Sequence, residues 1–228
     1  MPKITVLLAD DHTVVRQGLR SLLASEPDIE VVAEAETGRQ AVQLAKKFLP
    51  EVIVMDIAMP LLNGLDATRQ IVHETPSARV IILSSYSDDE YVEQLMDAGA
   101  IGYLLKQTAS NDVIKAIREA RQGNAYFSPA VSRRMLEHYR RAFVNGQPVK
   151  KTTEALTSRE REVLQLIAEG NTNKQIAAVL CISVKTVEKH RQQVMDQLNI
   201  HDIAGLTRYA MSRGIIETKA PLLSSGPS

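Results

Sequence analysis

The sequence predicts an α/β domain, a linker helix and then an all-α domain. Apolar runs of strand length alternate five times with stretches of helical spacing, and polar side chains follow where the runs end. This alternation is typical of parallel strands joined by helical crossovers, so we expect a doubly wound, five-stranded parallel sheet with helices on both faces. Helix-capping signatures after residue 151 then predict at least three successive helices, and so an all-α second domain.

The expected strands are continuous apolar runs, and each is followed by a stretch in which apolar residues recur at helical spacing. The strands are expected at Ile4–Ala9, Val31–Ala33, Val52–Met55, Val80–Leu83 and Ile101–Leu105. The helices are expected at Val14–Ala24, Gly38–Phe48, Leu65–His73, Asp89–Ala98 and Asp112–Arg121. This first domain is expected to span residues 3–122.

Length and composition fit two globular domains in a reducing, cytoplasmic setting. The chain has 228 residues, of which 44% are hydrophobic and 24% charged. No apolar run is long enough to span a bilayer, and the first residues lack the pattern of a signal peptide. The one cysteine, Cys181, excludes an internal disulfide and an all-cysteine metal cage, and we expect it to be a small buried hydrophobe.

The two halves of the chain carry opposite net charges. Residues 1–122 contain 12 Lys and Arg against 18 Asp and Glu, whereas residues 123–228 contain 15 against 9. A basic half joined to an acidic one indicates that the second half meets a polyanion, although an ordinary solvated surface would also fit an excess of this size.

Five polar residues follow the ends of expected strands. They are Asp10, Asp11, Asp56, Ser84 and Lys106. Carboxyl ends of parallel strands share one edge of the sheet, so these side chains are expected in one crevice. Crowded carboxylates repel one another unless a cation neutralises them, and hard oxygen ligands suit Mg²⁺. Singly, each residue is better explained as a helix cap, a backbone partner or a solvated charge; together they predict a site.

A carboxylate beside Mg²⁺ can attack phosphorus and form an acyl phosphate. We assign Asp56 as the nucleophile and Asp10 and Asp11 as the acids that hold the metal. Lys106 would offset the oxyanion charge, and the hydroxyl of Ser84 would bind a phosphate oxygen.

These residues carry a resemblance over about residues 3–122. Asp10-Asp11, the segment VMDIAMP, Ser84 and GYLLK (Gly102–Lys106) together resemble the receiver domain of two-component response regulators, whose sheet is flavodoxin-like. The resemblance implies that Asp56 accepts a phosphoryl group from a phosphohistidine on a sensor histidine kinase.

By the same resemblance, the metal ligands would be Asp11, Asp56 and the backbone carbonyl of Ala58, with Asp10 acting mainly through water. Ser84 and Tyr103 resemble the switch pair of that family, in which the hydroxyl moves towards the phosphate and the aromatic ring fills the vacated space. Without the resemblance, Tyr103 would be an ordinary half-buried strand tyrosine.

The sequence departs from the family pattern at three positions. Gln107 stands where many receivers have proline, so the cis peptide often found there is not expected. Ala58 and Tyr86 occupy positions that tune dephosphorylation in the family, and they leave the lifetime of the acyl phosphate open.

The linker, residues 123–151, is expected to contain a helix. Ser128-Pro129 resembles a helix start, and Asn145-Gly146 resembles a stop. Four arginines lie on this segment. They could contact DNA or the acidic domain, but we favour a solvated face. They are Arg133, Arg134, Arg140 and Arg141.

The last domain, residues 152–217, contains a helix-turn-helix candidate. Capping boxes begin at Thr157 and Thr172, a tight turn follows at Cys181-Ile182, and Ser183 caps a third helix near Val184–Leu198. On that helix Val187, Val194 and Leu198 share the face that is expected to be buried.

The opposite face of the third helix is polar. It contains Lys185, Glu188, Lys189, Gln192 and Asp196. Alone, such a face is best read as solvated; behind a compact turn it can enter a major groove, where lysine and glutamine bind purine edges and Thr186 binds phosphate. Glutamate would be repelled by phosphates unless it reads a base, so Glu188 favours sequence reading.

The segments LTSREREVLQLIAEGNTNKQIA, ISVKTVEKH and LTRYAMSRG resemble the LuxR-type output domain of NarL/FixJ response regulators. The match places the helix-turn-helix at residues 173–192, with Lys185, Glu188, Lys189 and Gln192 facing the groove. It also makes Asp202–Arg213 a fourth helix with a dimer contact, for which Leu206 and Tyr209 are candidates unless they belong to the domain's own core. Residues 218–228 are expected to be a disordered tail.

The sequence therefore predicts a transcription regulator that phosphorylation of Asp56 switches to a homodimer on promoter DNA. Two alternatives stay open. A Mg²⁺-dependent phosphatase would share the crevice but would normally need a second acid, and Ala58 stands where one would lie. A constitutive DNA-binding protein would use the first domain for protein contacts alone.

Overall fold

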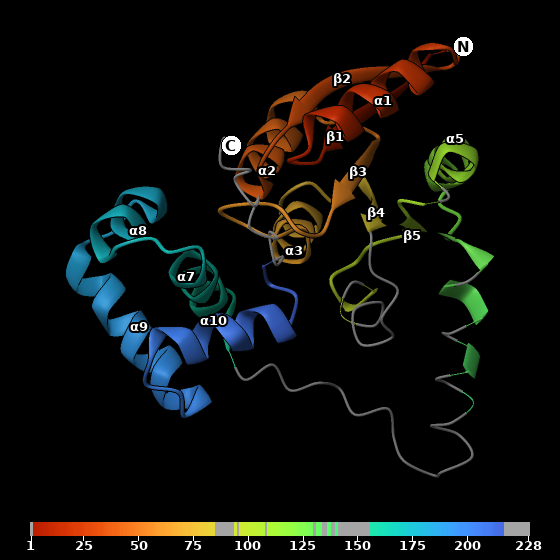
Figure 1. Cartoon of the computed structure of the whole chain (residues 1–228). Helices are drawn as coiled ribbons and strands as arrows, with labels where there is room; N and C mark the ends of the chain where they lie inside the picture. Colours follow the sequence, from red (N-terminus) through yellow and green to blue (C-terminus); the bar gives the residue numbers. More distant parts are fainter. Residues whose placement is uncertain are drawn as a thin grey trace, which may run out of the picture.

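A computed structural model of the chain shows a sheet domain and a helical domain side by side (Figure 1). It describes residues 2–84, 94, 96–107, 109–129, 131–133, 136–137, 140 and 156–216. Among these residues, no helix combines the length and apolarity needed to cross a membrane.

The sheet is wholly parallel, as predicted, but in the part of the chain that the structure describes it has six strands instead of five. Its strands are β1 (Ile4–Ala9), β2 (Ile29–Ala35), β3 (Val52–Asp56), β4 (Arg79–Ser84), β5 (Gly102–Leu105) and β6 (Tyr126–Phe127). Their order is β2-β1-β3-β4-β5-β6. The extra strand pairs Gly102 with Tyr126 and Tyr103 with Phe127. Two residues are too few to produce a period-2 pattern, so the sequence could not predict this strand.

Helices cover both faces of the sheet, which is therefore doubly wound. The helices of this domain are α1 (Thr13–Ala24), α2 (Gly38–Phe48), α3 (Gly64–Glu74) and α5 (Ala109–Arg121). Alternate strand residues point to opposite faces: Leu7 packs in the core beneath α2 and α3, whereas Val6 and Leu8 pack in the core beneath α1 and α5. The continuous apolar runs of the sequence follow from this burial on two sides.

Two expected helices lie mainly outside the described residues. Of the expected helix Asp89–Ala98, residues 94, 96 and 97 are described and are helical. Of the linker helix, the described residues 129, 131–133, 136–137 and 140 are helical. Val131 is fully buried in the core beneath α2 and α3, so this helix begins against the sheet domain.

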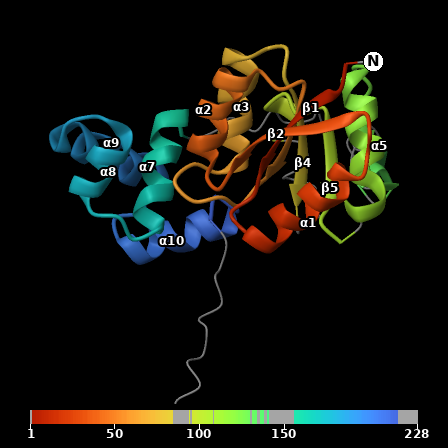
Figure 2. The same cartoon turned by 90° about the horizontal axis from the view of Figure 1, so that it is seen from above.

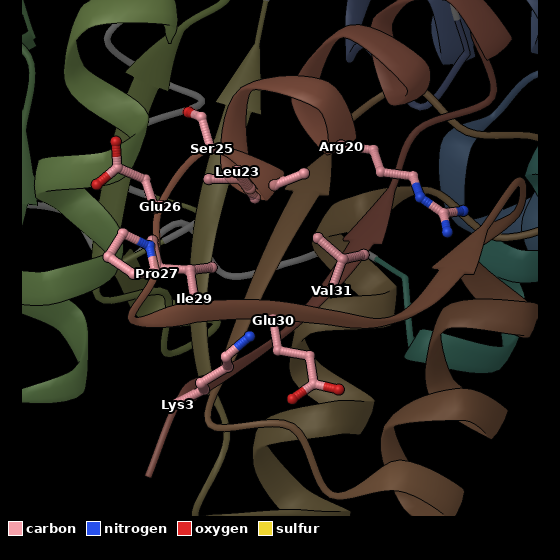
Figure 3. A pocket seen from close by; sticks show the side chains of 10 residues that line it. Lys3, Arg20, Leu23, Ser25, Glu26, Pro27, Ile29, Glu30 and Val31 are labelled. Atoms are coloured by element: carbon pink, nitrogen blue, oxygen red, sulfur yellow. The ribbon is translucent and has the colours of Figure 1, made fainter. Parts of the chain in front are cut away.

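A shallow cavity of about 490 Å³ lies between the end of α1 and the start of β2 (Figure 3). Side chains of both signs line it, including Lys3, Arg20, Glu26 and Glu30. It lies at the amino end of β2, and so away from the strand edge at which Asp10 and Asp56 lie. The cavity therefore plays no part in the acidic site.

Gly64 begins α3 where the backbone passes very close to Asp56. A Cβ at Gly64 would lie 2.0 Å from the main-chain oxygen of Asp56, so neither group could stay in place. We expect Gly64→Ala to lower the free energy of unfolding by about 2–3 kcal/mol in urea denaturation. Gly18→Ala, in the exposed middle of α1 with nothing within 4 Å, is the control and should raise it by about 0.5–1 kcal/mol. Equal effects would contradict the close approach.

In its described residues, 156–216, the second domain consists of four helices, as predicted. They are α7 (Ser158–Ala168), α8 (Asn173–Leu180), α9 (Val184–Leu198) and α10 (Ile203–Ser212). Both predicted capping boxes are present, at Thr157 with Glu160 and at Thr172 with Gln175. Cys181 was expected to be buried, and this is wrong: it is exposed, because it forms the left-handed C-cap of α8 in the turn before α9.

Candidate acidic site and nucleic-acid interface

The carboxyl ends of β1 and β3 bring three predicted acids together. Asp10 follows β1, Asp56 is the last residue of β3, and both are 2% exposed. One ligand atom from each of Asp10, Asp11, His12 and Asp56 lies within 4.8 Å of the others. The sheet therefore gathers these acids at one edge, as the strand pattern predicted.

Lys106 lies between two of these carboxylates. Its Nζ is 2.8 Å from Oδ2 of Asp56 and 2.9 Å from Oδ2 of Asp10. Burial lowers the pKa of the Lys106 amine, but the charges and hydrogen bonds of Asp56 and Asp10 outweigh burial and leave the pKa raised. The lysine is therefore a stable positive charge against the acid at the end of β3.

Main-chain hydrogen bonds fix the acids in place. The N–H of Ile57 donates to Oδ1 of Asp56 over 2.8 Å, and the N–H of His12 donates to Oδ1 of Asp10 over 2.8 Å. The guanidinium of Arg16 is buried, and its Nη1 donates to the main-chain oxygen of Asp10 over 2.7 Å. Arg16 could not be singled out from the sequence, because an arginine on a helical face is usually a solvated cation.

His12 also lies in the acidic cluster, although it was not predicted as a site residue. Its Nδ1 lies 2.8 Å from Oδ1 of Asp11 and 3.3 Å from Oδ1 of Asp10. The signal was present, since this histidine directly follows the acid pair at a strand end, where metal ligands gather.

The other predicted site residues lie on the neighbouring strands. Ser84 ends β4 next to the end of β3, is 1% exposed, and its main-chain oxygen accepts from the N–H of Lys106 over 2.7 Å. Tyr103 lies on β5 and is 1% exposed, so it is fully buried and not half-buried. Ala58 lies in the loop after β3 and is partly exposed. The described residues contain no cis peptide bond.

The donor set fits a hard divalent cation. Asp10, Asp11 and Asp56 offer carboxylate oxygens, which Mg²⁺ prefers, and their mutual distances allow several to approach one ion. Three clustered carboxylates against one lysine leave a net negative charge that a cation would neutralise.

In the helical domain, the predicted reading face of α9 points into solvent. Lys185, Glu188, Lys189 and Gln192 are exposed, whereas Val187 and Val194 are fully buried. Thr186 is partly buried, and its hydroxyl shares a hydrogen bond of 2.8 Å with that of the N-cap Ser183. Nη1 of Arg191 donates to Oδ1 of Asn173 over 3.2 Å, which ties α9 to α8. The helix-turn-helix therefore presents its polar face for contact with another molecule.

Leu206, a candidate for the dimer contact, belongs to the core of its own domain, which is the alternative that the sequence left open. Leu206 is 0% exposed and packs in the core of its own domain with Val163 and Val187. A helical period identifies an apolar face but not the element that covers it, so the sequence left both readings open. Tyr209, one turn along α10, is partly buried against the same core.

The chain is similar to known two-domain regulators along almost its whole length. Residues 6–118 match the family described as response regulator receiver domain, and residues 154–210 match bacterial regulatory proteins of the luxR family. The transcriptional regulatory protein LiaR of Bacillus subtilis is 41% identical over 91% of this chain and 96% of its own length.

Solved structures of similar fold also match most of the chain. RcsB of Salmonella typhimurium matches with a TM-score of 0.62 and 28% identity over 93% of this chain and 98% of its own. An RcsB–DNA complex matches with a TM-score of 0.57 and 27% identity over 92% of this chain and 98% of its own. This chain therefore belongs to the NarL/FixJ family of response regulators, with a receiver domain followed by a LuxR-type helix-turn-helix domain.

Proposed function

We propose that this regulator is switched by Mg²⁺-dependent phosphorylation of Asp56 from a sensor histidine kinase in the cytoplasm, and that phosphorylation promotes dimerisation and promoter binding. The observation that carries the proposal is the position of Lys106, 2.8 Å from Oδ2 of Asp56 inside a cluster of carboxylates. An acid held beside a fixed cation at a strand end suits nucleophilic attack on phosphorus.

The residues divide the chemistry among them. A carboxylate oxygen of Asp56 forms the new bond to phosphorus while the bond from phosphorus to the donor nitrogen breaks. Lys106 neutralises charge on the phosphoryl oxygens, and the hydroxyl of Ser84 donates to one of them. Asp11, Asp56 and the carbonyl of Ala58 would hold Mg²⁺, with Asp10 acting mainly through water; bound Mg²⁺ supplies further positive charge at those oxygens.

The phosphoryl group adds about −1.5 to −2 charges at the end of β3. We propose that Ser84 and Tyr103 respond as the switch pair and that the output domains then pair through α10 with Tyr209 at the contact. Two recognition helices would then meet half-sites about 34–36 Å apart.

Gel-shift titrations with and without acetyl phosphate and Mg²⁺ test the proposal. The expected result is tighter binding of promoter DNA only when both are present, together with acid-labile phosphate on the protein. Absence of that phosphate by mass spectrometry would favour the constitutive DNA-binding alternative.

Lys189→Ala tests the reading face of α9. Lys189 is exposed on the face opposite Val187 and Val194, where a lysine contacts a base edge or a phosphate. We expect the substitution to weaken specific DNA binding by about 1–3 kcal/mol in gel-shift titrations. Lys3→Ala removes the same charge from an exposed site in the receiver and should leave binding unchanged. If both variants lost the same amount of DNA affinity, Lys189 would contribute only general charge attraction and no specific contact.

A further inference from the structure

The outer face of α7 is buried although it is polar. Arg161, Glu162 and Gln165 are 7%, 6% and 0% exposed. Figures 1 and 2 both show α7 on the side of the sheet where α2 and α3 lie. All three side chains hydrogen-bond to residues of the receiver. An amphipathic helix that buries its polar face in this way has a partner on that face.

Gln165 is at the centre of this contact, and its amide makes four hydrogen bonds. Its Oε1 accepts from the main-chain N–H of Asn63 over 2.8 Å and from Nδ2 of Asn63 over 3.1 Å. Its Nε2 donates to the main-chain oxygen of Met59 over 2.9 Å and to Glu169 over 2.8 Å. Two donors and two acceptor sites are the full capacity of a glutamine amide, so the fit is complete.

Both of its receiver partners lie in one loop, Ile57–Asn63. This loop begins directly after Asp56 and includes Ala58, whose carbonyl is a proposed metal ligand. Gln165 therefore holds the main chain of the loop at Met59 and Asn63, on either side of Leu61.

Leu61 shows that the loop is held in an unfavourable conformation. Its φ is +67°, in the left-handed region that residues other than glycine rarely adopt. Its N–H donates to Oε1 of Glu169 over 3.1 Å, and its side chain packs against the core of the output domain. Strained backbone persists where its surroundings fix it, and here the output domain supplies part of those surroundings.

Ion pairs surround this centre. Nε of Arg161 lies 2.9 Å from Oδ1 of Asp66, which is 1% exposed. On the other side, Oε2 of Glu162 is 2.7 Å from Nη2 of Arg39, and its Oε1 accepts from Gln70 over 2.8 Å. These polar groups can be hydrated when the domains part, which suits a contact that forms and breaks.

We propose that Gln165 is a positioning residue for the phosphoacceptor site and that it couples the domain contact to that site directly through the loop Ile57–Asn63, independently of Ser84 and Tyr103. The inference rests on the proposed function of Asp56. In this proposal, the strained conformation at Leu61, which the output domain helps to hold, relaxes when the domains part, and the relaxed loop presents the carbonyl of Ala58 to Mg²⁺ more favourably. Because coupling is reciprocal, parting the domains strengthens Mg²⁺ binding by the same factor by which bound Mg²⁺ favours parting.

The reading face of α9 is exposed even though the two domains are in contact, since Lys185 and Lys189 face solvent. The contact therefore does not cover the DNA-binding surface. It fixes where the output domain stands relative to the receiver, and its release lets two output domains take up the spacing of two half-sites.

Gln165→Glu tests the coupling in the full chain. The carboxylate has nearly the same shape but loses both donors, and it places a negative charge beside Glu169 and the oxygen of Met59. Spin labels on the exposed Cys181 and on a Gln43→Cys variant report the distance between the domains. We expect a longer distance without any phosphodonor and, by calorimetry, a Mg²⁺ dissociation constant lowered about fivefold or more.

Two further variants keep the test interpretable. Gln165→Leu adds no charge and should show the same changes, whereas Gln122→Glu, at an exposed position after α5, should behave as wild type. A wild-type distance and wild-type Mg²⁺ affinity in both Gln165 variants would overturn the coupling.

Ser84→Ala separates the direct route from the switch pair. If the inference is right, phosphorylation with acetyl phosphate still lengthens the distance in Ser84→Ala; an unchanged distance with phosphate bound at Asp56 would overturn it. Mass spectrometry distinguishes failure of this inference from failure of the proposed function. If the proposed function failed, the wild type would carry no phosphate on Asp56.

Discussion

Asp56→Asn is expected to abolish phosphorylation and, with it, the effect of a phosphodonor on DNA binding. The amide keeps the oxygen that accepts the N–H of Ile57, so the end of β3 retains its local structure. It lacks the charged oxygen that Lys106 contacts at 2.8 Å and that would attack phosphorus. We expect no acid-labile phosphate after incubation with acetyl phosphate and Mg²⁺, as measured by mass spectrometry.

DNA binding supplies the second readout for this variant. Wild-type protein is expected to bind promoter DNA more tightly after phosphorylation, whereas Asp56→Asn should keep its basal affinity with or without the donor. Glu30→Gln removes an exposed carboxylate on β2, away from the acidic site, and serves as the control, with a wild-type response. If Asp56→Asn bound DNA as tightly as the phosphorylated wild type, the switch would be rejected.

The acidic site was predictable because strand ends are visible in the sequence. The run Val52–Met55 is wholly apolar and stops at an acid, and a parallel sheet places all such stops at one edge. Lys106 was predictable for the same reason, since GYLLK is again a strand followed by a charge. The sequence did not predict which carboxylates the lysine contacts, because that depends on strand order and side-chain direction.

The domain contact was not predictable, because it depends on a surface that no periodic pattern marks. Arg161, Glu162 and Gln165 lie on the polar face of α7 and would read as solvated, yet all three are buried against the receiver. Leu206 illustrates a related limit: a helical period shows which residues are buried together but not whether the partner is the same domain or a second chain.

The balance of charge at the acidic site predicts that Lys106→Met has two large, opposite effects: slower phosphorylation of Asp56 and tighter binding of Mg²⁺. Methionine has a similar length and adapts to its surroundings, so the change removes the ammonium with little loss of packing. Its removal takes away the charge that would stabilise the transferring phosphoryl group, and we expect phosphorylation of Asp56 by acetyl phosphate to slow about 10²–10³-fold. Mg²⁺ binding should become tighter, because the cation that competes for Asp10 and Asp56 is gone.

The same substitution should destabilise the receiver in the absence of Mg²⁺. Lys106 is 16% exposed and Asp10 and Asp56 are almost fully buried, so the variant leaves buried carboxylates without their cation, at a cost of about 3 kcal/mol in urea denaturation. Saturating Mg²⁺ binds the folded site alone and should restore most of that stability. Lys3→Met, at an exposed position, should change neither the stability without Mg²⁺ nor the gain in stability that Mg²⁺ gives.

The pH dependence of phosphorylation checks that Lys106 acts as a fixed charge. Its pKa is raised by Asp56 and Asp10 despite burial, so the amine stays protonated well above neutral pH and loses its proton only above its ordinary range. The wild-type rate should therefore show no fall that depends on Lys106 between about pH 6 and pH 9. A fall in this range that Lys106→Met removes, or weaker Mg²⁺ binding in that variant, would contradict the assignment of Lys106 as the counter-ion of the phosphoryl group.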